Sequence, residues 1–139
     1  MQKLNILVMD DEPEVREYLK NILERRGYLV FTAQDGEEGL EKIKQANIDI
    51  VLADIVMPKM DGLEFLRHVH DYDLRVEVIM ITGHSTLDRC IDAIEYGACG
   101  YLAKPLKVDN ILAKILKAKK NIDEKKEMLE RALEETRHK

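Results

Sequence analysis

Several residue types are scarce in this chain of 139 residues, which contains no tryptophan, two cysteines and three prolines. Two cysteines are too few for a fold that depends on disulfide bonds. No apolar run approaches the roughly 18 residues that a membrane-spanning helix needs. The apolar run after Lys3 is short and leads into acidic residues, whereas a signal peptide has small residues at its cleavage site. We therefore expect a cytoplasmic protein with no membrane partner.

The charge of the chain also excludes a class of function. The formal net charge is -5 at pH 7, which argues against a nucleic-acid-binding surface over the whole chain. Residues 1–106 hold 12 basic and 20 acidic side chains, and residues 107–139 hold 10 and 7. We expect no direct nucleic-acid binding by this chain, and different tasks for its acidic body and its mildly basic tail.

Short apolar runs alternate five times with patterns of helical spacing. The strand-like runs are residues 4–9, 29–31, 48–53, 76–81 and 99–103, and the helix-like segments are residues 13–26, 37–46, 62–70, 86–96 and 107–139. Strict alternation predicts a parallel sheet with helices on both faces. The first, third and fourth runs are apolar without alternation, as expected of central strands that are buried on both faces. The sequence therefore predicts a doubly wound α/β fold.

Polar side chains follow these runs at the point where each strand should end. Asp10 and Asp11 follow the first run, Asp54 the third, Thr82 the fourth and Lys104 the fifth. In a parallel sheet these ends lie at one edge, where ligands of such folds bind. Three carboxylates held close together raise one another's pKa. A divalent cation relieves this repulsion, and Mg²⁺ prefers carboxylate oxygens, water and phosphoryl oxygens.

This set of side chains suits phosphoryl transfer to a carboxylate. A carboxylate can act as a nucleophile and form an acyl phosphate. Phosphoryl transfer mainly requires positioning and neutralisation of charge. Mg²⁺ and the ammonium of Lys104 would supply positive charge, and the hydroxyl of Thr82 would supply a hydrogen bond.

Four motifs in order carry a family resemblance: Met9-Asp10-Asp11-Glu12, the nine residues 54–62 (DIVMPKMDG), Thr82-Gly83-His84, and residues 101–105 (YLAKP). Together they resemble the receiver domain of bacterial two-component response regulators, over about residues 4–120. The resemblance implies a flavodoxin-like five-stranded parallel sheet with strand order 2-1-3-4-5. It also implies a Mg²⁺-dependent phosphoaspartate switch, which acts on no substrate other than its own phosphoryl group.

The resemblance assigns roles to the acceptor and to the metal ligands. Asp54 would accept the phosphoryl group and also bind Mg²⁺. Asp11 would bind Mg²⁺ directly, with Asp10 acting through water. The backbone carbonyl of Val56 would complete the ligands that the protein provides.

The resemblance likewise assigns the residues that respond to phosphorylation. Lys104 would pair with the phosphoryl group, Thr82 would move toward a phosphoryl oxygen, and Tyr101 would rotate together with Thr82. Val56 and His84 occupy variable positions beside the phosphoryl group, so we expect them to influence its lifetime.

The implied partners are a sensor histidine kinase or a phosphotransfer protein, which would donate the phosphoryl group. Phosphorylation would then reshape the surface of the fourth helix, the fifth strand and the fifth helix. This change would control an output domain or an output protein.

The tail extends the fifth helix beyond the expected receiver. Residues 107–139 contain no glycine and no proline, so we expect a receiver domain over 1–120 and a helical extension over 121–139. One seven-residue series, 115, 122, 129 and 136, forms a fair coiled-coil seam, and the series 111, 118, 125 and 132 forms a weak one. The extension could therefore be a coiled-coil linker that makes a homodimer, or a solvated helix.

Two other functions remain open at this point. An aspartate-based phosphohydrolase also needs an aspartate at a strand end, Mg²⁺ and a lysine, but it carries a second aspartate where this chain has Val56. A coiled-coil scaffold with a vestigial acidic site is the other alternative. The glycine motifs of dinucleotide and ATP sites are absent.

Overall fold

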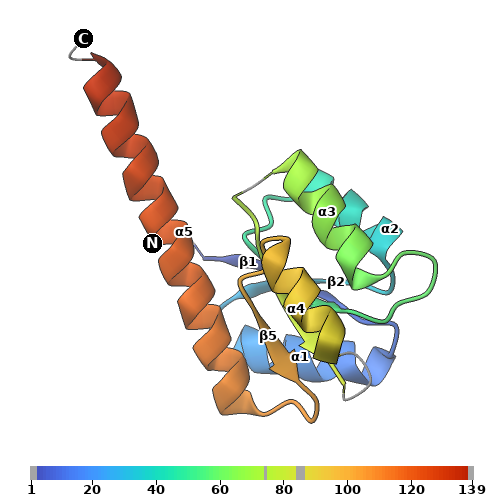
Figure 1. Ribbon diagram of the computed structural model, residues 1–139. Helices are drawn as coiled ribbons and strands as arrows, with labels where there is room; N and C mark the ends of the chain where they lie inside the picture. The colour runs from blue at the N-terminus through green and yellow to red at the C-terminus, as the bar shows by residue number, and fades with distance from the viewer. Residues whose placement is uncertain (1–2, 74, 84–86, 138–139) are drawn as a thin grey trace.

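The computed structural model describes residues 3–73, 75–83 and 87–137. Strands and helices alternate along this part of the chain (Figure 1). The strands are β1 (Asn5–Met9), β2 (Leu29–Ala33), β3 (Ile50–Asp54), β4 (Glu77–Thr82) and β5 (Gly100–Ala103). The helices are α1 (Pro13–Arg25), α2 (Gly36–Gln45), α3 (Gly62–Tyr72), α4 (Leu87–Glu95) and α5 (Val108–Arg137).

The five strands form one parallel sheet in the order β2-β1-β3-β4-β5. Both the fold class and the strand order are those that the resemblance implied. In the register, Met9 lies opposite Ala53 and Thr82 lies opposite Ala103. The carboxyl ends of β1, β3, β4 and β5 therefore meet at one edge, which we call the acceptor edge.

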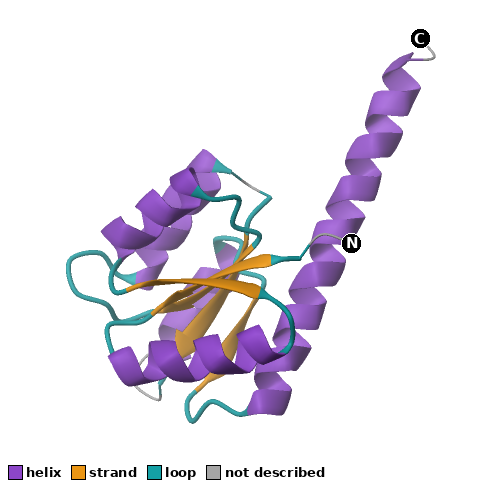
Figure 2. Ribbon diagram, turned by 180° about the vertical axis from the view of Figure 1, so that it is seen from behind, coloured by secondary structure: helices purple, strands orange, loops and turns teal. Residues whose placement is uncertain are grey.

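Helices cover both faces of the sheet, which gives three layers (Figure 2). One face packs against α1 and α5, whose buried apolar side chains include Leu19, Leu23 and Ile115. The other face packs against α2, α3 and α4, with Phe65 of α3 fully buried at its centre. The central strands are buried on both faces, as their unbroken apolar sequence predicts.

Local sequence fixes where helices begin. Pro13 stands in the first turn of α1, where a backbone N–H would lack a helical partner. The carboxylates of Asp35 and Asp61 cap α2 and α3 by accepting from the N–H groups of Glu38 and Glu64. Asp61 thus ends the loop that leads from Asp54 into α3.

The helix α5 runs without a break past residue 120 and projects beyond the body of the domain (Figure 1). Its inner face packs in the domain's own core as far as Ile122. The Nζ of Lys125, one turn further on, lies 3.4 Å from the carboxylate of buried Glu77. The side chains of Met128, Leu129 and Leu133 beyond this point are exposed.

In the first half of α5, the side chains of the expected coiled-coil seam pack in the core of the domain. Ile111, Ile115, Ala118 and Ile122 belong to the two predicted series, yet they pack against the sheet. A seven-residue spacing fits both kinds of contact, because each needs one apolar stripe along a helix. Among the described residues, no helix is long and apolar enough to cross a membrane.

Candidate functional site

Asp54 is the last residue of β3 and lies at the centre of the acceptor edge. Its side chain is almost fully buried. The Oδ1 atom accepts a hydrogen bond from the backbone N–H of Val56 at 3.0 Å. The Oδ2 atom accepts one from the Nζ of Lys104 at 3.1 Å. These two bonds fix the orientation of the carboxylate, with the cationic group of Lys104 beside it.

Lys104 follows β5 and precedes Pro105 through a cis peptide bond. Its backbone N–H donates to the carbonyl of Thr82 at 2.8 Å, which ties it to the end of β4. Its Nζ also lies 3.8 Å from a carboxylate oxygen of Asp10. Burial lowers the pKa of Lys104, but the hydrogen bond and charge of Asp54, with the charge of Asp10, outweigh it and raise the pKa overall. The lysine is therefore held in its charged form between two carboxylates.

Asp10 follows β1 and is completely buried. Its Oδ1 accepts from the N–H of Glu12 at 2.9 Å, whereas its Oδ2 has no hydrogen-bond partner among the described residues. Burial, opposed by the bond from Glu12 and reinforced by the nearby charge of Asp54, raises the pKa of Asp10 from 3.8 to about 6. The Oδ2 atom is paired with Lys104 at 3.8 Å but accepts no hydrogen bond among the described residues, so it can still accept a ligand.

The carboxylates of Asp10, Asp11 and Glu12 form a group whose oxygen atoms lie within 4.8 Å of one another. Hard oxygen donors and exposed neighbours that leave room for water suit Mg²⁺. The site thus fits the metal that the sequence predicts. Asp54 is not part of this group, but the Nζ of Lys104 pairs with both Asp54 and Asp10 and so links the two.

Sequence reasoning missed two residues at this site, one member of the carboxylate group and one neighbour of it. Glu12 adds a third carboxylate, and it could have been noted because it directly follows Asp11. Arg16 donates from its guanidinium to the backbone carbonyl of Asp10 at 2.6 Å. Asp10 precedes α1 and Arg16 lies within it, and no sequence motif links residues six apart across a helix start.

The two predicted switch residues lie on neighbouring strands. Thr82, the last residue of β4, is buried and donates its hydroxyl to the carbonyl of Gly83 at 3.0 Å. Tyr101 of β5 is 39% exposed, with the Nζ of Lys114 at 5.8 Å from the ring centre. Tyr101 thus stands on the surface beside α5. His84, which was expected to influence phosphoryl lifetime, lies outside the described residues.

Val56, the other residue expected to influence that lifetime, stands on the loop after β3. Its side chain is exposed, and its N–H orients Asp54. An exposed valine places an apolar group beside the acceptor and offers water no side-chain hydrogen bond. The role of its carbonyl as a metal ligand stays a prediction.

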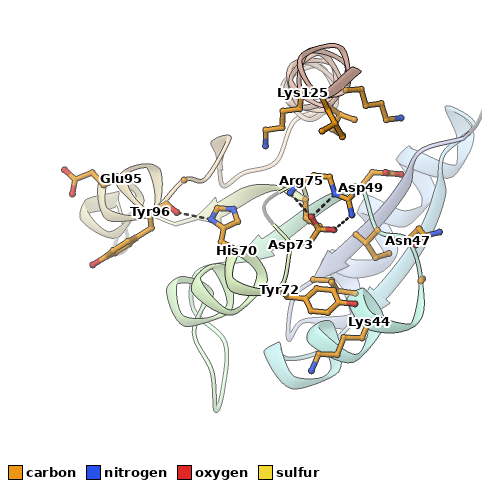
Figure 3. Close-up of a pocket in the computed structure, with 18 residues that line it drawn as sticks. Lys44, Asn47, Asp49, His70, Tyr72, Asp73, Arg75, Glu95, Tyr96 and Lys125 are labelled. Carbon is orange, nitrogen blue, oxygen red and sulfur yellow. Dashed lines mark hydrogen bonds and ion pairs between the residues drawn. The ribbon is translucent and has the colours of Figure 1, made fainter. Parts of the chain in front are cut away.

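A cavity of about 1330 Å³ opens at the opposite edge of the sheet, beneath the projecting part of α5 (Figure 3). Ile48, Val76 and Ile122 contribute buried apolar side chains to its lining. Arg75 and Asp73 pair with each other within it, at 3.1 and 3.2 Å. None of the predicted site residues is among the residues that line this cavity.

A family model described as the response regulator receiver domain matches residues 6–116. The chain belongs to this receiver family. A crystal structure of a response regulator receiver domain protein from Clostridium thermocellum is 35% identical, with a TM-score of 0.81 over 90% of this chain and 98% of that one. Membership favours the receiver over the aspartate-based phosphohydrolase, because the match covers the whole acceptor edge.

Curated relatives of this chain are transcriptional regulators. The DNA-binding transcriptional regulator NtrC of Proteus hauseri is 35% identical over 127 residues, which are 91% of this chain and 27% of NtrC. The transcriptional regulatory protein DltR of Streptococcus agalactiae serotype III is 36% identical over 112 residues, which are 81% of this chain and 50% of DltR. The chain thus spans a quarter to a half of the length of these relatives.

These relatives correct the partner prediction. The sequence led us to exclude nucleic acid, and that exclusion is wrong, because the matched relatives are regulators of transcription and one is named DNA-binding. The inference failed because net charge describes only the surface of these 139 residues. It says nothing about the greater part of NtrC, which this chain does not match.

Proposed function

We propose that this receiver is a Mg²⁺-dependent phosphoaspartate switch of a two-component pathway, with Asp54 as acceptor and a sensor histidine kinase or phosphotransfer protein as donor. One observation carries the proposal. The buried carboxylate of Asp54 is bonded to Lys104, which also lies 3.8 Å from Asp10 Oδ2, a buried oxygen that accepts no hydrogen bond among the described residues. The family membership of residues 6–116 supports it.

The proposed reaction is an in-line transfer that the receiver itself promotes. A carboxylate oxygen of Asp54 attacks the phosphorus of the donor and forms a P–O bond, while the bond from phosphorus to the donor's imidazole nitrogen breaks. The electron pair of that bond stays on the imidazole. Loss of the phosphoryl group is attack by water on the same phosphorus, which regenerates the carboxylate.

The chain's own residues prepare this step by fixing charge and orientation. The N–H of Val56 holds one carboxylate oxygen of Asp54 and Lys104 donates to the other. Lys104 would pair with an oxygen of the incoming phosphoryl group. Mg²⁺ bound by Asp10, Asp11 and neighbouring oxygens would neutralise the charge shared by these carboxylates and the phosphoryl group. Preorganised groups of this kind lower the barrier because they need no rearrangement during transfer.

The proposed output surface consists of α4, β5 and α5. It exposes five apolar side chains: Ile91, Ile94, Tyr101, Val108 and Leu116. Exposed apolar side chains gathered on adjacent elements are typical of an interaction site. Since NtrC and DltR are named as regulators of transcription, we infer that the output is transcription. Cytoplasmic location stays a prediction.

Intact mass spectrometry after incubation with acetyl phosphate tests this function. We expect one phosphoryl adduct with Mg²⁺, and none without Mg²⁺ or in Asp54→Asn. Asp49→Asn is a matched control, because Asp49 lies at the opposite edge and should leave the adduct unchanged. Absence of an adduct in the wild type would favour the scaffold with a vestigial site.

A further inference from the structure

The described side chains that α4 buries against the core are small. Among its described residues, the buried ones are Cys90 and Ala93, which are both small. Its large apolar side chains Ile91 and Ile94 face outward. By contrast α3 buries Phe65 and two other large apolar side chains. The free energy gained from apolar burial grows with the buried area. Polar contacts at the ends of α4 therefore contribute a larger share to fixing this helix than they do for α3.

An ion pair joins the start of α4 to the loop that follows the acceptor. The guanidinium of Arg89 donates to a carboxylate oxygen of Asp61, and both side chains are about one-third exposed. The other oxygen of Asp61 accepts from the N–H of Glu64 at 3.0 Å and caps α3. Burial raises the pKa of Asp61, but this cap and Arg89 lower it overall. Asp61 therefore stays ionised and available to Arg89.

Asp61 is one residue from a tight contact with the acceptor strand. The backbone N–H of Gly62 donates to the carbonyl of Ile55 at 2.8 Å. A side-chain carbon at Gly62 would lie 2.8 Å from the carbonyl oxygen of Asp54 and 2.5 Å from Met80. Because this contact leaves no free space, a displacement of Asp61 would shift the backbone of Asp54.

The far end of α4 has a denser set of contacts. The guanidinium carbon of Arg67 lies 4.4 Å from the ring centre of Tyr96, which follows α4. The Nδ1 of His70 lies 3.1 Å from the carbonyl oxygen of Tyr96 (Figure 3). Gly97 has a φ of +101°, and the His70 ring occupies the position that a side chain at Gly97 would need. Among the described residues, the C-terminal end of α4 is thus held by several contacts, and the end nearer the acceptor by the Asp61–Arg89 ion pair.

We propose that Arg89 is a positioning residue of the switch, which restrains the N-terminal end of α4 through Asp61 and so slows phosphorylation of Asp54. The inference rests on the proposed function. When the ion pair opens, α4 turns about its firmly held end at Tyr96 and Gly97. The loop from Asp54 to Asp61 is then free to adjust to a phosphoryl group. The resting state is favoured by the free energy of this one ion pair.

The sign of the effect separates this role from plain electrostatics. Arg89 is a cation on the acceptor side of α4, so its removal would by charge alone weaken attraction of an anionic donor and slow the reaction. Loss of the restraint has the opposite effect and accelerates it. For an ion pair that is one-third exposed we expect acceleration of about two- to five-fold.

The experiment measures phosphorylation rates with acetyl phosphate and Mg²⁺ by intact mass. Arg89→Ala and Asp61→Asn should each react faster than the wild type, and asparagine retains the cap on α3. The double variant should be no faster than either single variant, because both remove the same pair. Arg89→Lys should return toward the wild-type rate. Arg75→Ala, which breaks an ion pair at the opposite edge, is the matched control and should not change it.

Hydrogen exchange of the unphosphorylated proteins gives an independent measurement. Arg89→Ala should raise exchange in the first turns of α4 and leave the amides after Ile94 as in the wild type. A wild type that takes up no phosphoryl group would overturn the proposed function. A wild type that does, with Arg89→Ala equal or slower or with unchanged exchange in α4, would overturn the role of Arg89 alone.

Discussion

At the scale of single residues, burial of Asp10 opposes the ionised form of its carboxyl group. Its carboxylate is fully buried, one of its oxygens accepts no hydrogen bond among the described residues, and its pKa is raised to about 6. Because this value lies above the ordinary 3.8, the unfolding free energy falls as the pH rises between the two values. At neutral pH the ionised group costs stability. Such a group is typical of a binding site rather than of a core.

We therefore predict that Asp10→Asn stabilises the metal-free protein at neutral pH. The substitution removes a buried charge and keeps the shape, so the unfolding free energy should rise by about 1–3 kcal/mol. Urea unfolding in the presence of a chelator measures this change.

The same variant should lose its response to metal. Mg²⁺ stabilises the wild type by mass action if it binds only the folded state, and Asp10→Asn should show a much smaller gain. Asp35→Asn, which replaces an N-cap by another good cap, serves as control. An unchanged or lower stability of Asp10→Asn in chelator would show that burial of this carboxylate is tolerated without a ligand.

At the scale of elements, the junction between β3 and α3 depends on Gly62. A side-chain carbon there would lie within 2.8 Å of the backbone of both Asp54 and Ile55, and neither can move without shifting the acceptor strand. We predict that Gly62→Ala lowers the unfolding free energy by about 1–3 kcal/mol, measured in urea. Gly83→Ala is the control, since a side-chain carbon there meets nothing within 4 Å. Equal stability of the two variants would contradict the close contact.

Sequence patterns predicted the elements and the residues at their ends because both depend on local or periodic signals. Asp54 and Thr82 are the last residues of their strands, so a shift of one or two residues in the predicted bounds did not displace the site. The Asp61–Arg89 pair depends on the packing of α4 beside α3, across 28 residues of sequence. No pattern within a single sequence predicts such a long-range ion pair.

At the scale of the whole molecule, α5 packs in the core of the receiver as far as Ile122, whereas the family match ends at residue 116. Ile122 is buried in the core, and Lys125 neutralises buried Glu77. The boundary at residue 120 stays a prediction, and it would separate both side chains from the domain. Sequence could not reveal this, because the seven-residue spacing of α5 suits a coiled coil and a sheet-packed helix equally.

We predict that a chain ending at residue 120 is less stable than one ending at residue 126. The shorter chain loses the burial of Ile122 and leaves Glu77 without Lys125, which together should cost about 2–4 kcal/mol. Urea unfolding of both chains beside the full 139 residues checks this. The chain ending at 126 should match the full chain, since residues 127–137 are exposed. Three equal midpoints would place the boundary at 120.

The most direct test of the account locates the phosphoryl group itself. The protein is phosphorylated with acetyl phosphate and Mg²⁺ and then treated with borohydride, which reduces an acyl phosphate of aspartate to homoserine. Peptide mass spectrometry then identifies the altered residue. We predict homoserine at position 54, in the Mg²⁺-treated sample alone. Homoserine at position 10 or 11, or none at all in a protein that carries the adduct, would contradict Asp54 as the acceptor.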